Sequence, residues 1–101
     1  MAQAATKVRL GKVMVKHINV KITGKVQGVG FRYCAYEKFV ELGLLGKAEN
    51  TPDRAVLIDV EGPEDKLDLL TEWCRRGPTG AEVENVEIIE VAEPFVPLKN
   101  G

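Results

Sequence analysis

The order of hydrophobic patterns in this sequence predicts an α/β sandwich of the α+β kind, in which an antiparallel sheet carries two helices on one face. Four runs have the alternation or β-branched content of strands, and two segments with helical spacing separate them in the order β-α-β-β-α-β. Of the 101 residues, 45% are apolar and 29% are charged, which is typical of one globular domain.

The first strand is predicted over residues 14–23, because the sequence MVKHINVKIT alternates β-branched and polar side chains. A glycine-rich segment, GKVQGVGFR, follows at residues 24–32. The first helix begins within this segment, because apolar residues then recur at helical spacing: Phe31, Ala35, Phe39 and Leu42. Gly43 is the residue type that commonly ends a helix, so we expect a helix of about three turns.

The second and third strands are predicted to form a hairpin. Residues 44–50, LLGKAEN, have weak strand character, whereas residues 55–60, AVLIDV, have strong strand character. The residues between them, Thr-Pro-Asp, favour a turn. The two strands are therefore expected to pair side by side.

The second helix and the last strand complete the order. Residues 62–65, GPED, place a proline and two acids at the start of a helix, where a missing N–H is harmless and negative charge is favourable. Residues 75–78, RRGP, end that helix with basic residues and a proline. Residues 81–91, AEVENVEIIEV, alternate again and predict the last strand.

The N-terminus and the cysteines bear on the compartment. No apolar run reaches the roughly 20 residues of a membrane span, and charges interrupt the N-terminus before a signal-peptide core could form. We therefore expect a cytoplasmic protein with no membrane partner, and we expect residues 1–13 to be a flexible extension. Cys34 and Cys74 lack CxxC or paired-histidine spacing, which favours free thiols and argues against a metal site.

The glycine-rich segment lies in the positive part of the chain. Up to Arg32 there are seven Lys or Arg residues and no Asp or Glu, although the net charge is −1. Backbone N–H groups of a glycine-rich turn that leads into a helix form a concave site suited to a phosphate or a carboxylate. Arg32 would lie in the first turn of that helix, where a cation is unfavourable unless an anion is bound. The same glycines could also form a tight turn and nothing more.

Asn50 is expected near Arg32. The two strands of a β-α-β unit run parallel, so the segments that follow them emerge at the same edge of the sheet. Asn50 is therefore a candidate for the same site. An asparagine at a strand end also commonly caps its own backbone, and the residues alone leave both interpretations open.

Other classes of site fit less well. The segment lacks the Lys-Ser/Thr of a P-loop, and the predicted sheet is not the parallel sheet of a dinucleotide-binding fold. The sequence contains no serine, and His17 lies within a strand, which excludes a Ser-His-Asp triad. The first and third predicted strands carry no aromatic residue for base stacking, so we expect no nucleic-acid partner.

Three separated segments together resemble the acylphosphatase family: GKVQGVGFR, LGLLGKAEN and WCRRGPTGAEVENVEI. The resemblance runs from about His17 to Val91 and implies a ferredoxin-like sandwich, with residues 14–101 as the acylphosphatase-like domain. It also implies hydrolysis of the carboxyl–phosphate anhydride of a small acyl phosphate, without a metal or another cofactor. We expect the protein to be a monomer.

The resemblance also implies roles for individual residues. Arg32 would bind the phosphoryl group and Asn50 would position the attacking water. The phosphoryl oxygens would accept hydrogen bonds from backbone N–H groups of the loop Gln27, Gly28, Val29, Gly30 and Phe31. This set agrees with the chemistry of phosphoryl transfer, which needs positioning and charge stabilisation above all.

The sequence departs from the family pattern next to Asn50. Glu49 stands where a basic or neutral residue is usual, and Asp53-Arg54 replaces Asp-Gly. By the two-residue period of a strand, Glu49 should point to the opposite sheet face from Asn50. Arg54 must either adopt a left-handed conformation or accept a different turn. These departures keep open an alternative, a non-catalytic module of the same fold that binds phosphate or carbamoyl phosphate.

Overall fold

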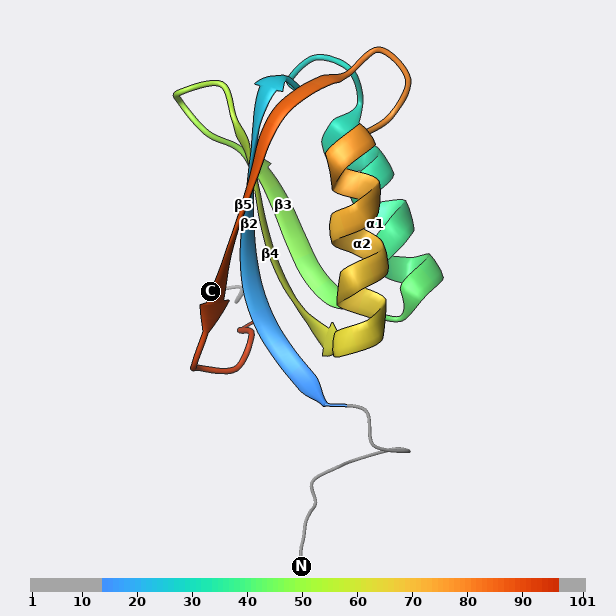
Figure 1. Ribbon diagram of the computed structural model, residues 1–101, viewed down its shortest axis with the longest axis vertical. Coiled ribbons are helices and arrows are strands. Elements are labelled where there is room, and N and C mark those ends of the chain that lie inside the picture. The colour runs from blue at the N-terminus through green and yellow to red at the C-terminus, as the bar shows by residue number, and fades with distance from the viewer. Residues whose placement is uncertain (1–13, 97–101) are drawn as a thin grey trace, which may run out of the picture.

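The computed structural model describes residues 14–96, and within them the predicted order of strands and helices is confirmed (Figure 1). The elements are β2 (Val15–Lys25), α1 (Phe31–Leu42), β3 (Leu45–Asn50), β4 (Val56–Pro63), α2 (Glu64–Arg76) and β5 (Glu82–Val91). The predicted extension, residues 1–13, and the last part of the predicted domain, residues 97–101, lie outside the described residues.

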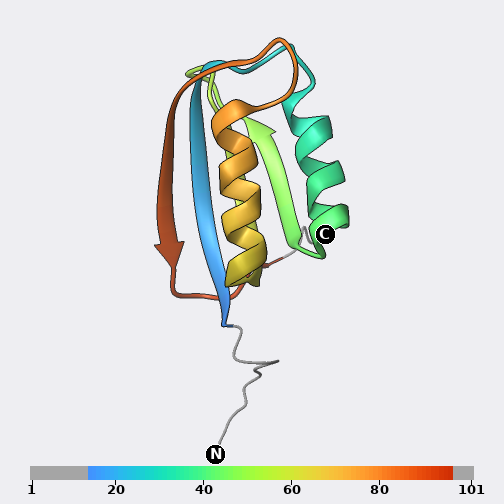
Figure 2. The same cartoon turned by 45° about the vertical axis from the view of Figure 1, so that its right-hand side comes forward.

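The strands form one antiparallel sheet in the order β3-β4-β2-β5. Helices α1 and α2 cover the same face of this sheet, as the predicted sandwich requires (Figures 1 and 2). The other face, called the open face below, carries alternate residues of each strand, such as Lys21 of β2 and Asp59 of β4. Because β2 and β3 both pair antiparallel with β4, they run parallel to each other and finish at the same end of the sheet.

The hydrophobic core lies between the sheet and the helices. It includes residues from both layers: Val20, Ile22, Ile58, Val60, Ala35, Phe39, Leu67, Leu70 and Cys74. Phe31, the first residue of α1, is also buried and contacts the Trp73 ring of α2 edge-on, with 5.2 Å between the ring centroids. This contact fixes the start of α1, and with it the end of the glycine-rich segment.

Two element boundaries differ from the predicted ones because strand pairing extends further than the local pattern suggests. Strand β2 continues to Lys25, which pairs with Glu82 of β5 after an irregularity in the register. Strand β4 continues to Pro63, which pairs with Val15, so α2 begins only at Glu64 and Pro63 is its N-cap residue. The predicted end of the first helix at Gly43 is confirmed.

Each of the two helices carries one cysteine. Cys34 and Cys74 are free, and burial raises the pKa of the Cys74 thiol to about 12. Neither helix of the described residues is long and apolar enough to cross a membrane.

Candidate active site

The loop between β2 and α1 contains two glycines that border open space. Gly28 and Gly30 adopt left-handed conformations, with φ of 79° and 78°, and a Cβ atom added at either would meet no other group within 4 Å. Helix α1 has no side-chain cap at Gly30 and no acidic residue in its first turn. The N–H groups of that first turn have no partner inside the helix. They give this accessible end of α1 a positive partial charge.

Arg32 is the second residue of α1 and its side chain is exposed. Within residues 14–96 it forms no ion pair with an acidic side chain. Arg32 therefore lies at the positive end of the helix dipole, and no acidic side chain of the described residues offsets its charge. A bound phosphoryl group would offset that charge.

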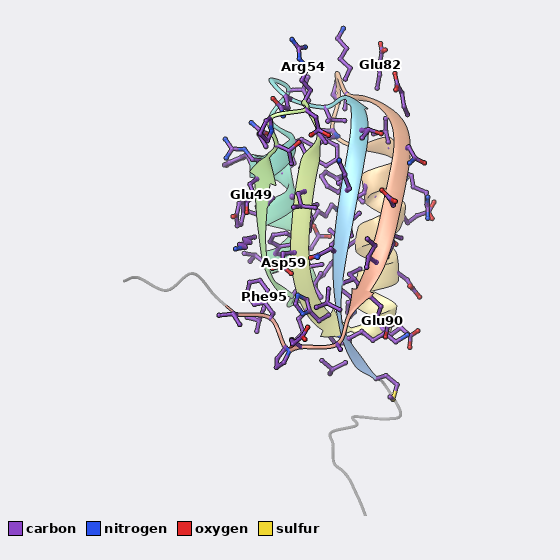
Figure 3. The ribbon with its side chains drawn as sticks, turned by 90° about the vertical axis from the view of Figure 1, so that its left-hand side faces the viewer. Glu49, Arg54, Asp59, Glu82, Glu90 and Phe95 are labelled. Atoms are coloured by element: carbon purple, nitrogen blue, oxygen red, sulfur yellow. The ribbon has the colours of Figure 1, made fainter. Side chains whose placement is uncertain are left out.

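Asn50 is the last residue of β3, at the end of the sheet where β2 also finishes. Ala48, two residues earlier, is buried beneath the helices, so Asn50 belongs to the helix-facing side of the strand. Glu49 is exposed and lies on the other side of β3, as predicted (Figure 3). Its carboxylate therefore does not point toward the loop.

The turn that follows Asn50 is closed by its own hydrogen bonds. The N–H of Thr51 donates to the carbonyl of Ala55 at 2.9 Å, and the N–H of Arg54 donates to the carbonyl of Thr51 at 3.0 Å. The Thr51 hydroxyl accepts from the N–H of Ala55 at 3.0 Å. Arg54 adopts the left-handed conformation, with φ of 70°, which is the first of its two expected alternatives.

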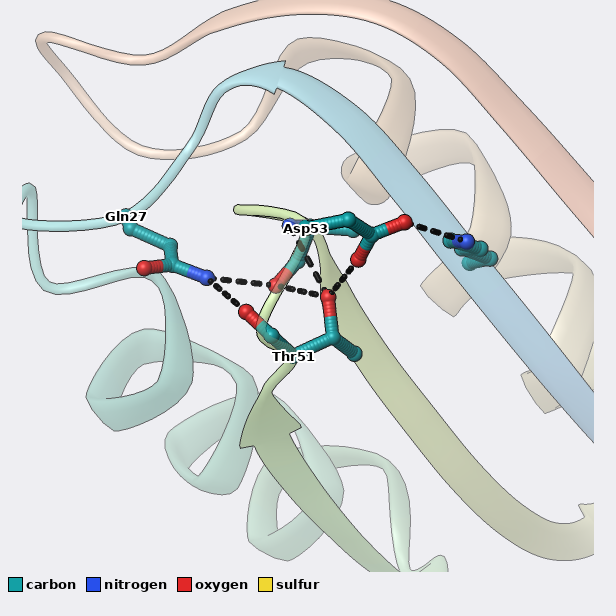
Figure 4. Close-up of polar contacts among 5 residues, drawn as sticks. Gln27, Thr51 and Asp53 are labelled. Carbon is teal, nitrogen blue, oxygen red and sulfur yellow. Dashed lines mark hydrogen bonds and ion pairs between the residues drawn. The ribbon is translucent and has the colours of Figure 1, made fainter.

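The side chain of Gln27 joins the glycine-rich loop to this turn (Figure 4). Its Nε2 atom donates to the carbonyl of Thr51 at 3.0 Å and to the carbonyl of Ala55 at 2.9 Å. Both amide hydrogens of Gln27 are thus used. The sequence predicted a role only for the backbone of Gln27, because nothing local to the loop indicates where its side chain reaches.

Asp53 ties the same turn to strand β2. One carboxylate oxygen accepts from the Thr51 hydroxyl, and the other accepts from Lys21 Nζ at 2.9 Å (Figure 4). These bonds, first that from Thr51 and then that from Lys21, lower the pKa of Asp53 to about 2. Asp53 correspondingly raises the pKa of Lys21. The sequence did not predict the ion pair between Lys21 and Asp53.

The two ends of the sheet differ in their chemistry. His17 lies near the start of β2, at the end away from the loop, where its ring contacts Asp59 and the carbonyl of Glu93. In the part of the chain that the structure describes, no group of three His, Cys, Asp or Glu side chains is placed to hold a metal ion. The loop end offers N–H donors, a permanent cation and a carboxamide, which together can bind and polarise a phosphoryl group.

Comparison with known proteins supports this interpretation. The protein-family model for acylphosphatase matches residues 18–96. The acylphosphatase of Methylococcus capsulatus is 42% identical over 78 residues, which cover 77% of this chain and 85% of that protein. The structure of an acylphosphatase from Coxiella burnetii superposes with a TM-score of 0.77 at 36% identity, over 82% of this chain and 87% of that one.

A structure of full-length HypF, in a phosphate- and nucleotide-bound form, is also similar. It superposes with a TM-score of 0.72 at 25% identity and covers 78% of this chain, but only 10% of the HypF chain. The same fold therefore also occurs as a small part of a much larger protein.

Proposed function

The chain belongs to the acylphosphatase family, whose members are hydrolases, and from that premise we propose that its active site consists of the loop 27–31, Arg32 and Asn50. The observation that carries this proposal is the arrangement at the end of the sheet where β2 and β3 both finish. An uncapped helix N-terminus adjoins the strand end that bears Asn50; it carries two left-handed glycines and an arginine that pairs with no acidic side chain of residues 14–96.

The loop and Arg32 bind the phosphoryl group in this proposal. The two glycines leave open space beside the loop, and in this proposal the N–H groups from Gln27 to Phe31 donate there to the phosphoryl oxygens. Arg32 can donate two parallel hydrogen bonds to the same group and neutralise charge that spreads over its equatorial oxygens. Donors that are in place before the substrate arrives need little reorganisation during the reaction.

Asn50 orients the attacking water. The water oxygen forms a new bond to phosphorus, and the bond between phosphorus and the acyl oxygen breaks with its electron pair on that oxygen. The leaving group is a carboxylate, a weak base, so its departure needs little help from a general acid. The products are the carboxylate and inorganic phosphate. One water proton stays on the new phosphate oxygen, and the other passes to a second phosphate oxygen or to solvent.

The test is hydrolysis of benzoyl phosphate in buffer with EDTA by the wild type, Arg32→Ala and Asn50→Ala. We expect Asn50→Ala to lose on the order of 100-fold in kcat while its inhibition constant for inorganic phosphate stays the same. Arg32→Ala should lose both turnover and phosphate binding. Lys66→Ala is the matched control and should behave as the wild type, because Lys66 lies in the first turn of α2, beside the start of β2 and away from the loop.

Two outcomes would decide against this proposal. A fully active Arg32→Ala protein would remove Arg32 from the site. A wild type that binds inorganic phosphate without turning over benzoyl, acetyl or carbamoyl phosphate would instead favour the non-catalytic phosphate-binding module.

A further inference from the structure

The turn after Asn50 has hydrogen bonds of its own, but it lies at the exposed end of an edge strand. Strand β3 lies at the edge of the sheet, and within residues 14–96 it pairs only with β4. Beyond it, Pro52, Asp53 and Arg54 are exposed, and Arg54 has a backbone conformation that arginine rarely adopts. A hairpin turn at the end of an edge strand is a region where local opening requires little free energy.

Gln27 supplies support from the side of the phosphate loop. Its neighbour Val26 is 1% exposed and belongs to the core, so the base of the Gln27 side chain is held firmly. Its amide donates to the first and the last carbonyl of the turn, those of Thr51 and Ala55. Movement of the turn away from the loop would break both hydrogen bonds in a partly buried place, where unpaired groups are costly.

Asp53 supplies support from the open face of the sheet. Lys21 lies in β2, a central strand, and pairs in register with Leu57 of β4. Its ammonium group holds Asp53, whose second oxygen accepts from the Thr51 hydroxyl. Figure 4 shows the turn with Gln27 on one side and the Asp53 carboxylate on the other, and that carboxylate pairs with Lys21.

We propose that Gln27 and Asp53 are positioning residues for hydrolysis, which act together to fix the Asn50 carboxamide relative to the phosphate loop. This inference rests on the proposed role of Asn50. Neither side chain contacts the reacting atoms in this scheme, and Asp53 is not part of the phosphate site. Loosening the turn should therefore impair orientation of the water and leave phosphate binding unchanged.

The experiment measures kcat and the inhibition constant of inorganic phosphate for Asp53→Ala and Gln27→Ala. Because a displacement of about 1 Å can cost up to 100-fold in rate, we expect each variant to lose about tenfold in kcat. For Asp53→Ala the phosphate inhibition constant should stay within about twofold of the wild-type value. Asp53→Asn retains an acceptor for the Thr51 hydroxyl, and should recover part of the lost kcat.

A double-mutant cycle separates positioning from general loss of structure. In the Asn50→Ala background, Asp53→Ala should have no further effect on the residual turnover, because the group that it positions is absent. Lys21→Gln tests the same support from the sheet side, and serves if the Asp53 variants do not fold. Glu64→Gln is the matched control, since it removes a carboxylate paired with Lys16, which lies near the start of β2 and away from the loop.

The outcomes distinguish this inference from the proposed function. An inactive wild type, or a fully active Asn50→Ala protein, would overturn the proposed function. An active, Asn50-dependent wild type whose Gln27 and Asp53 variants keep their kcat would overturn only the positioning role. A loss of turnover by the same factor in both backgrounds would also overturn it, because a general structural defect would act in this way.

Discussion

Gln27 and Thr51 are 24 positions apart in the chain, yet the side-chain amide of Gln27 donates a 3.0 Å hydrogen bond to the Thr51 carbonyl. This bond connects the loop after β2 with the turn after β3, the two segments that carry the proposed phosphate and water sites. Their relative placement is therefore a property of specific side chains as well as of the sheet.

Replacing Gly30 with alanine should weaken both stability and phosphate binding. With φ at 78°, an alanine at this position is strained by about 1–2 kcal/mol in the free energy of unfolding. Gly43→Ala is a matched control, because Gly43 has φ of 70° and equally open surroundings at the other end of α1. Urea unfolding should show similar losses for both variants, whereas phosphate titration should show weaker binding for Gly30→Ala only.

Replacing Arg54 with glycine should stabilise the protein. Glycine adopts the observed φ of 70° without the steric penalty of a side chain. After the greater freedom of glycine in the unfolded chain is subtracted, the net gain in the free energy of unfolding is about 1 kcal/mol. Urea unfolding measures this gain. Arg76→Gly, at the end of α2, should be destabilising instead, and a loss of stability in Arg54→Gly would contradict the prediction.

The contribution of Asp53 to stability should disappear only in strong acid. Its pKa in the folded protein, about 2, lies below the ordinary value of 3.8, so its stabilising effect is complete above the ordinary value and is lost as pH falls toward 2. The difference in urea midpoint between the wild type and Asp53→Asn should be constant above about pH 5 and shrink below about pH 4. A difference that changes between neutral and mildly alkaline pH would contradict this assignment.

His17 should give the opposite pH dependence. Desolvation lowers the pKa of His17, but its contacts with the Glu93 carbonyl and the Asp59 carboxylate outweigh that effect and raise it overall. Both partners accept hydrogen bonds, so the protonated ring satisfies both. Its stabilising effect should be complete below about pH 6.5 and be lost as pH rises through the raised pKa.

Thermal unfolding of the wild type and His17→Gln measures this effect. The Glu93 carbonyl that His17 contacts belongs to the segment that follows β5. Figure 3 shows this segment crossing one end of the open face toward Phe95, whose N–H donates to Glu61 at 2.7 Å. We expect the Tm difference between the two proteins to be largest near pH 6 and smallest near pH 9. A Tm difference that grows with pH would refute a charged His17.

Much of the fold could be predicted because it follows from short-range patterns. The helix Phe31–Leu42 and its end at Gly43 follow from apolar spacing and from the one residue type that readily takes a positive φ. The opposite placement of Glu49 and Asn50 follows from the two-residue period of a strand. The closeness of the loop and the strand end follows from the parallel run of β2 and β3.

The remaining features depend on which distant residues meet. Strand β4 reaches Pro63 because Val15 pairs with it, a partner that no local pattern specifies. The same holds for Gln27 with the Thr51 turn, and for Lys21 with Asp53, 32 positions away. A glutamine or a lysine has many rotamers of similar energy, so its partner is selected only when the folded sheet brings a suitable acceptor within its reach.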